Sequence, residues 1–252
     1  MLKTIFILLG IILLGCNSQS NKEVEIDTQE NILFIGNSYT YRNAGVDRHL
    51  RRLTEGMDNL PSTFITRAAQ GKYHLNTHWN DPETLEKLST QKWDKVILQE
   101  YSSGPTKQSK EFFKFGEKWK KRLLKLNPKT EILLYATWGY KKARRMTDSL
   151  DVQYERLKDK IDVSKVPVGL LWKSLKNKIN LYDGDGAHPN RKGTFLTACL
   201  FYEYLFDKDV RLTKHLDDRI SIEIQTKLKQ WAHDFKLEQS KVNISSLSLA
   251  SK

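Results

Sequence analysis

Cysteine is scarce in this chain, which has only Cys16 and Cys199 among its 252 residues. A fold held by disulfides is therefore excluded, because Cys16 follows an apolar N-terminal run and Cys199 lies inside a distant apolar helical pattern. We expect Cys199 to be a buried, unreactive thiol. The fold must rest on a hydrophobic core, which a chain of this length can bury within one domain.

Acidic residues are few relative to basic ones. The chain has 30 Asp and Glu against 42 Lys and Arg, which gives a formal net charge of +12. Such a balance favours anionic polysaccharide, a membrane surface or nucleic acid as surroundings. The basic residues are dispersed and no nucleic-acid-binding motif accompanies them, so nucleic acid is not an expected partner. We interpret runs such as Lys-Lys-Ala-Arg-Arg at 141–145 as a solvated basic face.

Long apolar runs are missing except near the N-terminus, where the run at 5–14 is too short to span a bilayer comfortably and has the form of an export signal. Leu-Leu-Gly-Cys at 13–16 resembles a bacterial lipoprotein cleavage box, so we predict removal of residues 1–15 and lipidation of Cys16. The alternative is a secreted protein with an incidental cysteine. Residues 16–30 are predicted to be a polar tether to a membrane of the bacterial cell envelope, facing the periplasm or the cell surface.

Apolar runs and amphipathic stretches alternate along residues 31–238, which we predict to form the folded domain. The pattern predicts strands at 32–35, 62–67, 95–98, 131–137 and 166–170, and helices at 43–57, 82–90, 107–126, 143–160, 171–179, 191–206 and 217–237. This alternation is typical of a three-layer α/β/α sandwich around a five-stranded parallel sheet. The Ser-rich residues 239–252 are predicted to be a flexible tail.

A serine stands where the first strand ends. Ser38 follows Gly-Asn in a strand-to-helix turn, a place where a hydroxyl projects and nearby backbone N–H groups are free. Far downstream, Asp185 and His188 lie three residues apart in a tight Gly-containing loop, with Asp183 as a rival carboxylate. Serine, aspartate and histidine are the ingredients of acyl transfer.

Here the sequence resembles the SGNH (GDSL-like) serine esterases and acetylesterases. The resemblance rests on Phe-Ile-Gly-Asn-Ser-Tyr-Thr at 34–40, on Gly71 in Gln-Gly-Lys-Tyr-His-Leu, and on Asp-Gly-Ala-His at 185–188, in the family's order. It implies a flavodoxin-like sheet, no cofactor, and hydrolysis through an acyl-enzyme on Ser38, with His188 as base. The family spacing selects Asp185 to orient His188.

The resemblance also implies an oxyanion hole made by the backbone N–H groups of Ser38 and Gly71. An alternative for Gly71 is a turn that needs a positive φ. The third family block departs from the usual Gly-x-Asn-Asp, because Leu98 is followed by Gln99 and Glu100, and the chain resembles a branch with Leu-Gln-Glu there. Gln99 is the candidate for the missing side-chain donor, and Ser102 is the alternative.

A metal site is weighed at His74, His78 and Asp81, because the two histidines are four residues apart. The segment lacks a third histidine and is not His-Glu-x-x-His, so no metal is expected. A Gly-rich phosphate loop is also missing, which argues against a flavin or phosphate ligand on the same sheet edge.

The expected substrate is a short acyl ester, such as an acetyl group on a carbohydrate. An anionic glycan would suit the basic surface of an exported protein, which we expect to be a monomer. Trp138 and Tyr140 follow the fourth strand, and Trp138 is either a sugar-stacking platform or part of the core. A lipase or lysophospholipase-type acyl hydrolase is the rival enzyme. A catalytically weak glycan-binding module is the alternative outside the enzymes.

Overall fold

The computed structural model describes residues 29–57 and 60–250. The predicted export signal, Cys16 and the tether up to residue 28 lie outside the described residues. The described chain contains a five-stranded sheet in the order β2-β1-β3-β4-β5, and all four strand pairs are parallel. Its strands are β1 Glu30–Gly36, β2 Thr63–Ala69, β3 Lys95–Leu98, β4 Glu131–Tyr135 and β5 Ser164–Val166.

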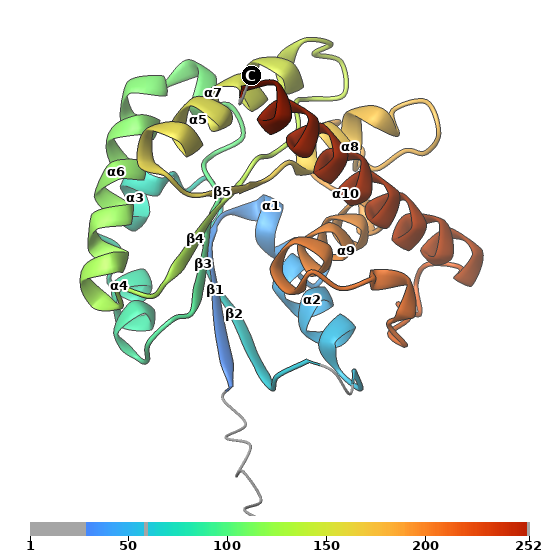
Figure 1. The fold of residues 1–252 in the computed structure, drawn as a ribbon, viewed down its shortest axis with the longest axis horizontal. Coiled ribbons are helices and arrows are strands. Elements are labelled where there is room, and N and C mark those ends of the chain that lie inside the picture. Colours follow the sequence, from blue (N-terminus) through green and yellow to red (C-terminus); the bar gives the residue numbers. More distant parts are fainter. Residues whose placement is uncertain (1–28, 58–59, 251–252) are drawn as a thin grey trace, which may run out of the picture.

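Helices cover both faces of the sheet, which confirms the predicted three-layer α/β/α sandwich (Figure 1). They are α1 Ser38–Tyr41, α2 Val46–Thr54, α3 Leu75–His78, α4 Pro82–Ser89, α5 Gly104–Lys107, α6 Ser109–Leu126, α7 Met146–Ile161, α8 Val168–Ser174, α9 Arg191–Phe206 and α10 Ile222–Ala250, with a 3₁₀ turn η1 at Val210–Leu212. In the part of the chain that the structure describes, no helix combines the length and the apolar character needed to cross a bilayer.

The core is divided by the sheet because successive side chains of a strand point to opposite faces. In β1, Ile32 and Phe34 pack with α2, α8, α9 and α10, whereas Leu33 and Ile35 pack with α3, α4, α6 and α7. All four β1 side chains are fully buried. Cys199 of α9 is buried and free, as predicted, and burial raises the pKa of its thiol. Strand β1 is therefore an interior strand that is buried on both faces of the sheet.

Strand β3 and helix α9 occupy their predicted ranges, but the prediction of a fifth strand at 166–170 is wrong beyond its first residue. Strand β5 ends at Val166, and α8 begins at Val168 directly after Pro167. A proline lacks the N–H of a continuing strand and suits a helix start. Gly169 then packs so closely that a Cβ there would lie 2.3 Å from the carbonyl oxygen of Thr137. A short apolar run fits a strand or a helix, and here Pro167 ends the strand and starts the helix.

The C-terminal prediction is also corrected. Helix α10 begins at Ile222 rather than at 217, and its backbone remains helical to Ala250, through most of the segment 239–252 that was predicted to be a flexible tail outside the domain. Neither glycine nor proline occurs between Ile222 and Ala250, so no residue of that range interrupts the helical backbone.

Candidate active site

The turn between β1 and α1 presents Ser38 as the first residue of a short helix. Asn37 caps that helix, because its Oδ1 accepts a hydrogen bond from the backbone N–H of Tyr39 at 3.2 Å. Gly36 has no room for a side chain, since a Cβ would lie 2.6 Å from Gln99 Oε1 and from Thr40 Oγ1. The close packing fixes the turn and places the serine at the carboxyl edge of the sheet.

The structure brings Ser38, His188 and Asp185 together in one chain of contacts. Ser38 Oγ lies 2.9 Å from His188 Nε2, and His188 Nδ1 lies 2.5 Å from Asp185 Oδ2. The other carboxylate oxygen accepts the backbone N–H groups of Ala187 and His188, each at 2.9 Å. The hydrogen bond from His188, followed by that from Ala187, lowers the pKa of Asp185. An ionised carboxylate thus faces the imidazole, which in turn faces the hydroxyl.

The loop that carries Asp185 and His188 is closed on itself and tied to the rest of the site. The N–H of Asp183 donates to the carbonyl of His188 at 2.8 Å, and Gly186 takes the positive φ of 68° that the turn requires. Asn43 Nδ2 donates to the carbonyl of Pro189 at 2.8 Å. These contacts hold the loop against the segment that follows α1.

Trp138 supports the same loop from the hydrophobic core. Its side chain is fully buried, and its ring stacks on Tyr39 at 4.4 Å and on Trp172 at 3.7 Å between centroids. Its indole N–H donates to the carbonyl of Ala187 at 2.9 Å. Trp138 is therefore core, and the alternative of an exposed sugar platform is wrong. Tyr140 is half-buried on the neighbouring loop.

Two backbone N–H groups remain available near the serine. Within residues 29–57 and 60–250, neither Ser38 N nor Gly71 N makes a hydrogen bond, and the loop of Gly71 is held close because Gln70 N donates to the carbonyl of Gly36. Gly71 does not have a positive φ. The residue with a positive φ in this loop is Lys72, at 65°. The alternative that Gly71 is only a positive-φ turn residue is therefore excluded.

Gln99 cannot supply the side-chain donor that the sequence suggested. It is fully buried, and its Nε2 already donates to Asn37 Oδ1 at 2.9 Å and to the carbonyl of Glu100 at 2.6 Å. Its Oε1 accepts from Asn37 N and from Thr40 Oγ1, each at 2.9 Å. The amide instead ties the end of β3 to the serine turn. Ser102, the alternative donor, is buried with its Oγ 2.9 Å from Tyr140 Oη.

The histidines considered as metal ligands have other partners. His78 is fully buried, with Nε2 2.7 Å from the carbonyl of Gly36 and Nδ1 2.8 Å from Thr84 Oγ1. Burial lowers the pKa of His78, which favours the neutral ring. His74 Nδ1 lies 2.6 Å from the buried carboxylate of Glu100. His78 thus supports the residue that precedes the Asn-Ser turn, a role that its sequence spacing does not reveal.

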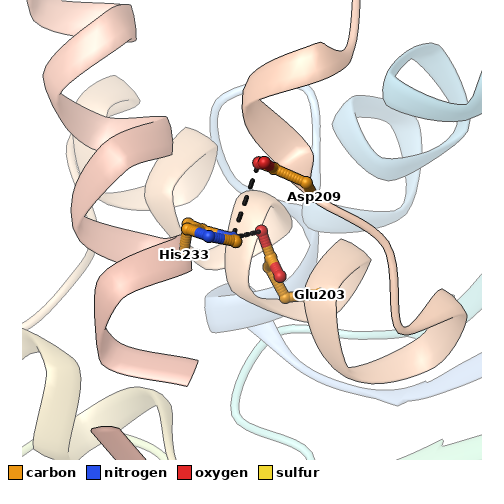
Figure 2. A group of neighbouring side chains, drawn as sticks. All are labelled: Glu203, Asp209 and His233. Atoms are coloured by element: carbon orange, nitrogen blue, oxygen red, sulfur yellow. Dashed lines mark hydrogen bonds and ion pairs between the residues drawn. The ribbon is translucent and has the colours of Figure 1, made fainter. Parts of the chain in front are cut away.

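A separate group of side chains between α9 and α10 has the composition of a metal site. Glu203, Asp209 and His233 offer ligand atoms within 4.8 Å of one another, and Figure 2 shows the imidazole directed at both carboxylates. Their atoms already have partners, however. Glu203 Oε1 lies 3.0 Å from His233 Nδ1 and accepts Val210 N at 2.8 Å, and the Arg211 guanidinium donates to both oxygens of Asp209. The group fastens α10 to α9.

No protein-family model and no curated protein matches the chain. Among solved structures, a proposed SGNH hydrolase from Slackia heliotrinireducens is 21% identical and matches with a TM-score of 0.60, over 71% of this chain and 100% of that one. A DUF4886 family protein from Bacteroides uniformis is 16% identical, with a TM-score of 0.64 over 83% of this chain and 95% of that one. The chain has the SGNH hydrolase fold.

A third structure with this SGNH fold is a variant of an acetyl xylan esterase from Geobacillus stearothermophilus. It is 16% identical, with a TM-score of 0.52 over 67% of this chain and 91% of that one. The structural matches establish the fold, but sequence identities this low do not carry over an activity. The chemistry of this SGNH-fold chain therefore has to be argued from its own residues.

Proposed function

We propose that this SGNH-fold protein is a serine esterase that hydrolyses short acyl esters. The observation that carries the proposal is the continuous contact from Ser38 Oγ through the His188 ring to the Asp185 carboxylate, over 2.9 and 2.5 Å. A hydroxyl, a base and a group that orients the base are the parts that nucleophilic acyl transfer needs.

In the proposed mechanism, Ser38 Oγ attacks the ester carbonyl carbon while His188 Nε2 takes the hydroxyl proton. Asp185 stabilises the resulting imidazolium, and its lowered pKa keeps it ionised for that task. The N–H groups of Ser38 and Gly71 bind the oxyanion, and one such donor is worth roughly 2.7–4 kcal/mol. His188 then protonates the leaving alcohol, and a water molecule, deprotonated by the same ring, releases the acid and restores Ser38.

We propose acetyl esters on a carbohydrate as the substrate. The neighbour from Geobacillus stearothermophilus is an acetyl xylan esterase, which shows that this fold serves such substrates. The surroundings of the triad also favour a polar substrate over a lipid chain. Among residues 29–57 and 60–241, the exposed large apolar side chains all lie outside the loops at 36–43, 70–74 and 183–190, namely Phe64, Leu126, Val152, Leu212, Leu216, Ile222 and Leu237.

The esterase proposal is tested with the full-length chain, purified in detergent, on p-nitrophenyl acetate and p-nitrophenyl laurate. We expect faster hydrolysis of the acetate, and its loss in Ser38→Ala with an unchanged melting temperature. A preference for laurate would support the lipase alternative. Turnover of neither ester by a folded protein that still binds oligosaccharide would support the glycan-binding module instead.

Attachment to the cell envelope through Cys16 is a separate proposal, supported by the Leu-Leu-Gly-Cys sequence at 13–16. If Cys16 carries the lipid, Cys16→Ser expressed in a bacterial host will move from the membrane fraction to the soluble fraction. A variant that remains bound to membranes contradicts lipidation at this residue.

A further inference from the structure

A cavity of about 1160 Å³ adjoins the loop that carries the proposed triad. Its wall includes residues 183–187 of that loop, and the rest is formed by residues 140–144 after β4, by Thr147 of α7 and by residues between 172 and 182 around the end of α8. The volume is above the roughly 300–1,000 Å³ of ordinary small-molecule pockets, so an extended ligand can enter. The cavity wall is connected to Ser38 through the His188 ring, which contacts Asp185 Oδ2 on one side and Ser38 Oγ on the other.

The cavity is lined by many more cations than anions. Its basic residues are Lys141, Lys142, Arg144, Lys173, Lys176 and Lys178, and its acidic residues are Asp183 and Asp185. The charge of Asp183 is offset by Arg42 at 3.0 Å, whereas Asp185 contacts the His188 ring and remains a negative charge in the wall.

Most of the cations, in contrast, are not neutralised. Lys173 pairs with Asp148, and Lys141 Nζ donates to Asn180 Oδ1 at 3.1 Å. Among the described residues, the other four cations (Lys142, Arg144, Lys176 and Lys178) have no acidic partner within salt-bridge distance. Residues 141–144 of the run that the sequence presents as a solvated face are thus part of a concave basic surface.

We propose that this cavity binds the anionic units of an acylated acidic polysaccharide, with carboxylate or sulfate groups on the sugar, while the acyl-bearing unit reaches Ser38. The inference deepens the proposed esterase function and rests on it. Lysine and arginine side chains bind such groups by charge-assisted hydrogen bonds. Asn177 in the same wall can bind sugar hydroxyls through its amide.

The position of Asp185 sets the register of such a ligand. Its ionised carboxylate lies in the cavity wall, so it repels an anionic group from the triad end and leaves the lysine-rich end as the favourable place for it. An acylated sugar unit that carries no acid group is therefore directed to the serine. A flat membrane would not fill a concave site, and the large exposed apolar side chains of the described residues are absent from the lining.

The test measures binding of a non-acylated oligogalacturonate to the full-length protein by calorimetry, with a neutral xylo-oligosaccharide as comparison. The cavity variant is Lys142→Glu with Lys178→Glu. The matched control is Lys110→Glu with Lys121→Glu, which makes the same change in net charge at exposed positions of α6. Thermal unfolding confirms that each variant is folded.

We expect the protein to bind the acidic oligosaccharide in preference to the neutral one, with an affinity that falls as salt is added. The cavity variant should bind roughly tenfold more weakly or worse, since each reversal replaces an attraction by a repulsion. The control variant should bind like the parent. Equal weakening in both variants, or equal affinity for the neutral oligosaccharide, overturns the inference.

A second arm uses vesicles that contain phosphatidylglycerol. If the cavity variant loses vesicle binding and keeps oligogalacturonate binding, the surface faces an anionic membrane and the inference is wrong. Because these measurements need no turnover, absence of binding contradicts the inference alone, whereas absence of p-nitrophenyl acetate hydrolysis contradicts the proposed function alone.

Discussion

The indole N–H of Trp138 donates a hydrogen bond to the carbonyl oxygen of Ala187 over 2.9 Å. This bond joins the end of β4 to the loop of Asp185 and His188, and the stacking of Trp138 between Tyr39 and Trp172 fixes its direction. The orientation of the proposed general base thus depends on a core residue that does not touch it.

Trp138→Phe should keep an aromatic ring in the stack, but it loses the donor and leaves a cavity beside Tyr39 and Trp172. The buried hydrogen bond is worth about 0.5–1.5 kcal/mol, so turnover of p-nitrophenyl acetate should slow roughly two- to tenfold, and the cavity should lower stability as well. Steady-state kinetics and urea unfolding measure the two effects. Unchanged turnover in a destabilised protein would show that Trp138 only packs the core.

The two aspartates of the triad loop should differ sharply on substitution. Asp185→Asn removes the carboxylate that orients His188 and should slow turnover roughly 10³- to 10⁴-fold. Asp183→Asn removes an exposed ion pair with Arg42, which is worth about 1 kcal/mol or less, and should leave turnover nearly unchanged. The reverse result, with Asp183 essential and Asp185 dispensable, would refute the assignment.

Gln99→Leu should act first on stability. The substitution leaves Asn37 N and the hydroxyl of Thr40 without the acceptor that Gln99 Oε1 provides, and each such buried group costs about 1–3 kcal/mol. We expect a lower urea midpoint together with slower turnover, because the serine turn loses its support. If turnover instead slows by roughly 10²-fold or more while the urea midpoint stays unchanged, Gln99 is the oxyanion donor after all.

The pH dependence of folding should include a contribution from His49. This side chain is buried, and burial lowers its pKa to about 4 despite the nearby Asp217. Since the unfolded chain takes up the proton near pH 6.5, stability should fall as pH drops from about 6.5 to about 4, by roughly 3 kcal/mol in total.

His49→Gln cannot be protonated and should remove this part of the slope. Urea unfolding free energies of the parent and the variant, measured across that pH range, give the comparison. Parallel pH profiles for the two proteins would contradict the role assigned to His49.

Sequence patterns are sufficient to predict the fold and to select Ser38, Asp185 and His188 as candidate site residues. Strand β3 and helix α9 match their predicted ranges, because an unbroken apolar run and an Asn cap are local signals. Ser38 can be chosen because it follows the first strand, and His188 because Asp-Gly-Ala-His at 185–188 resembles the family's motif. Their contact distance, however, depends on Asn43 and Trp138, which meet the loop only in the folded chain.

The sequence leaves open the roles of residues whose state is set by tertiary packing. Gln99 stands where a donor is needed, yet all its hydrogen-bonding capacity is used inside the core, which sequence position cannot show. Trp138 follows a strand end as a platform would, and its burial depends on Trp172, a distant residue. Residues 141–144 of the basic run line a cavity only because they lie beside residues 176–180 in the folded chain.

The proposed mechanism depends on the activation of Ser38 by His188. A fluorophosphonate reports on this activation, because it modifies an activated serine and mass spectrometry of the full-length protein then locates the adduct. We expect a single adduct on the peptide that contains Ser38, formed roughly 10²-fold more slowly or worse in a folded His188→Ala variant. A folded parent protein that forms no adduct, or one modified at another residue with Ser38 intact, would contradict the proposed mechanism.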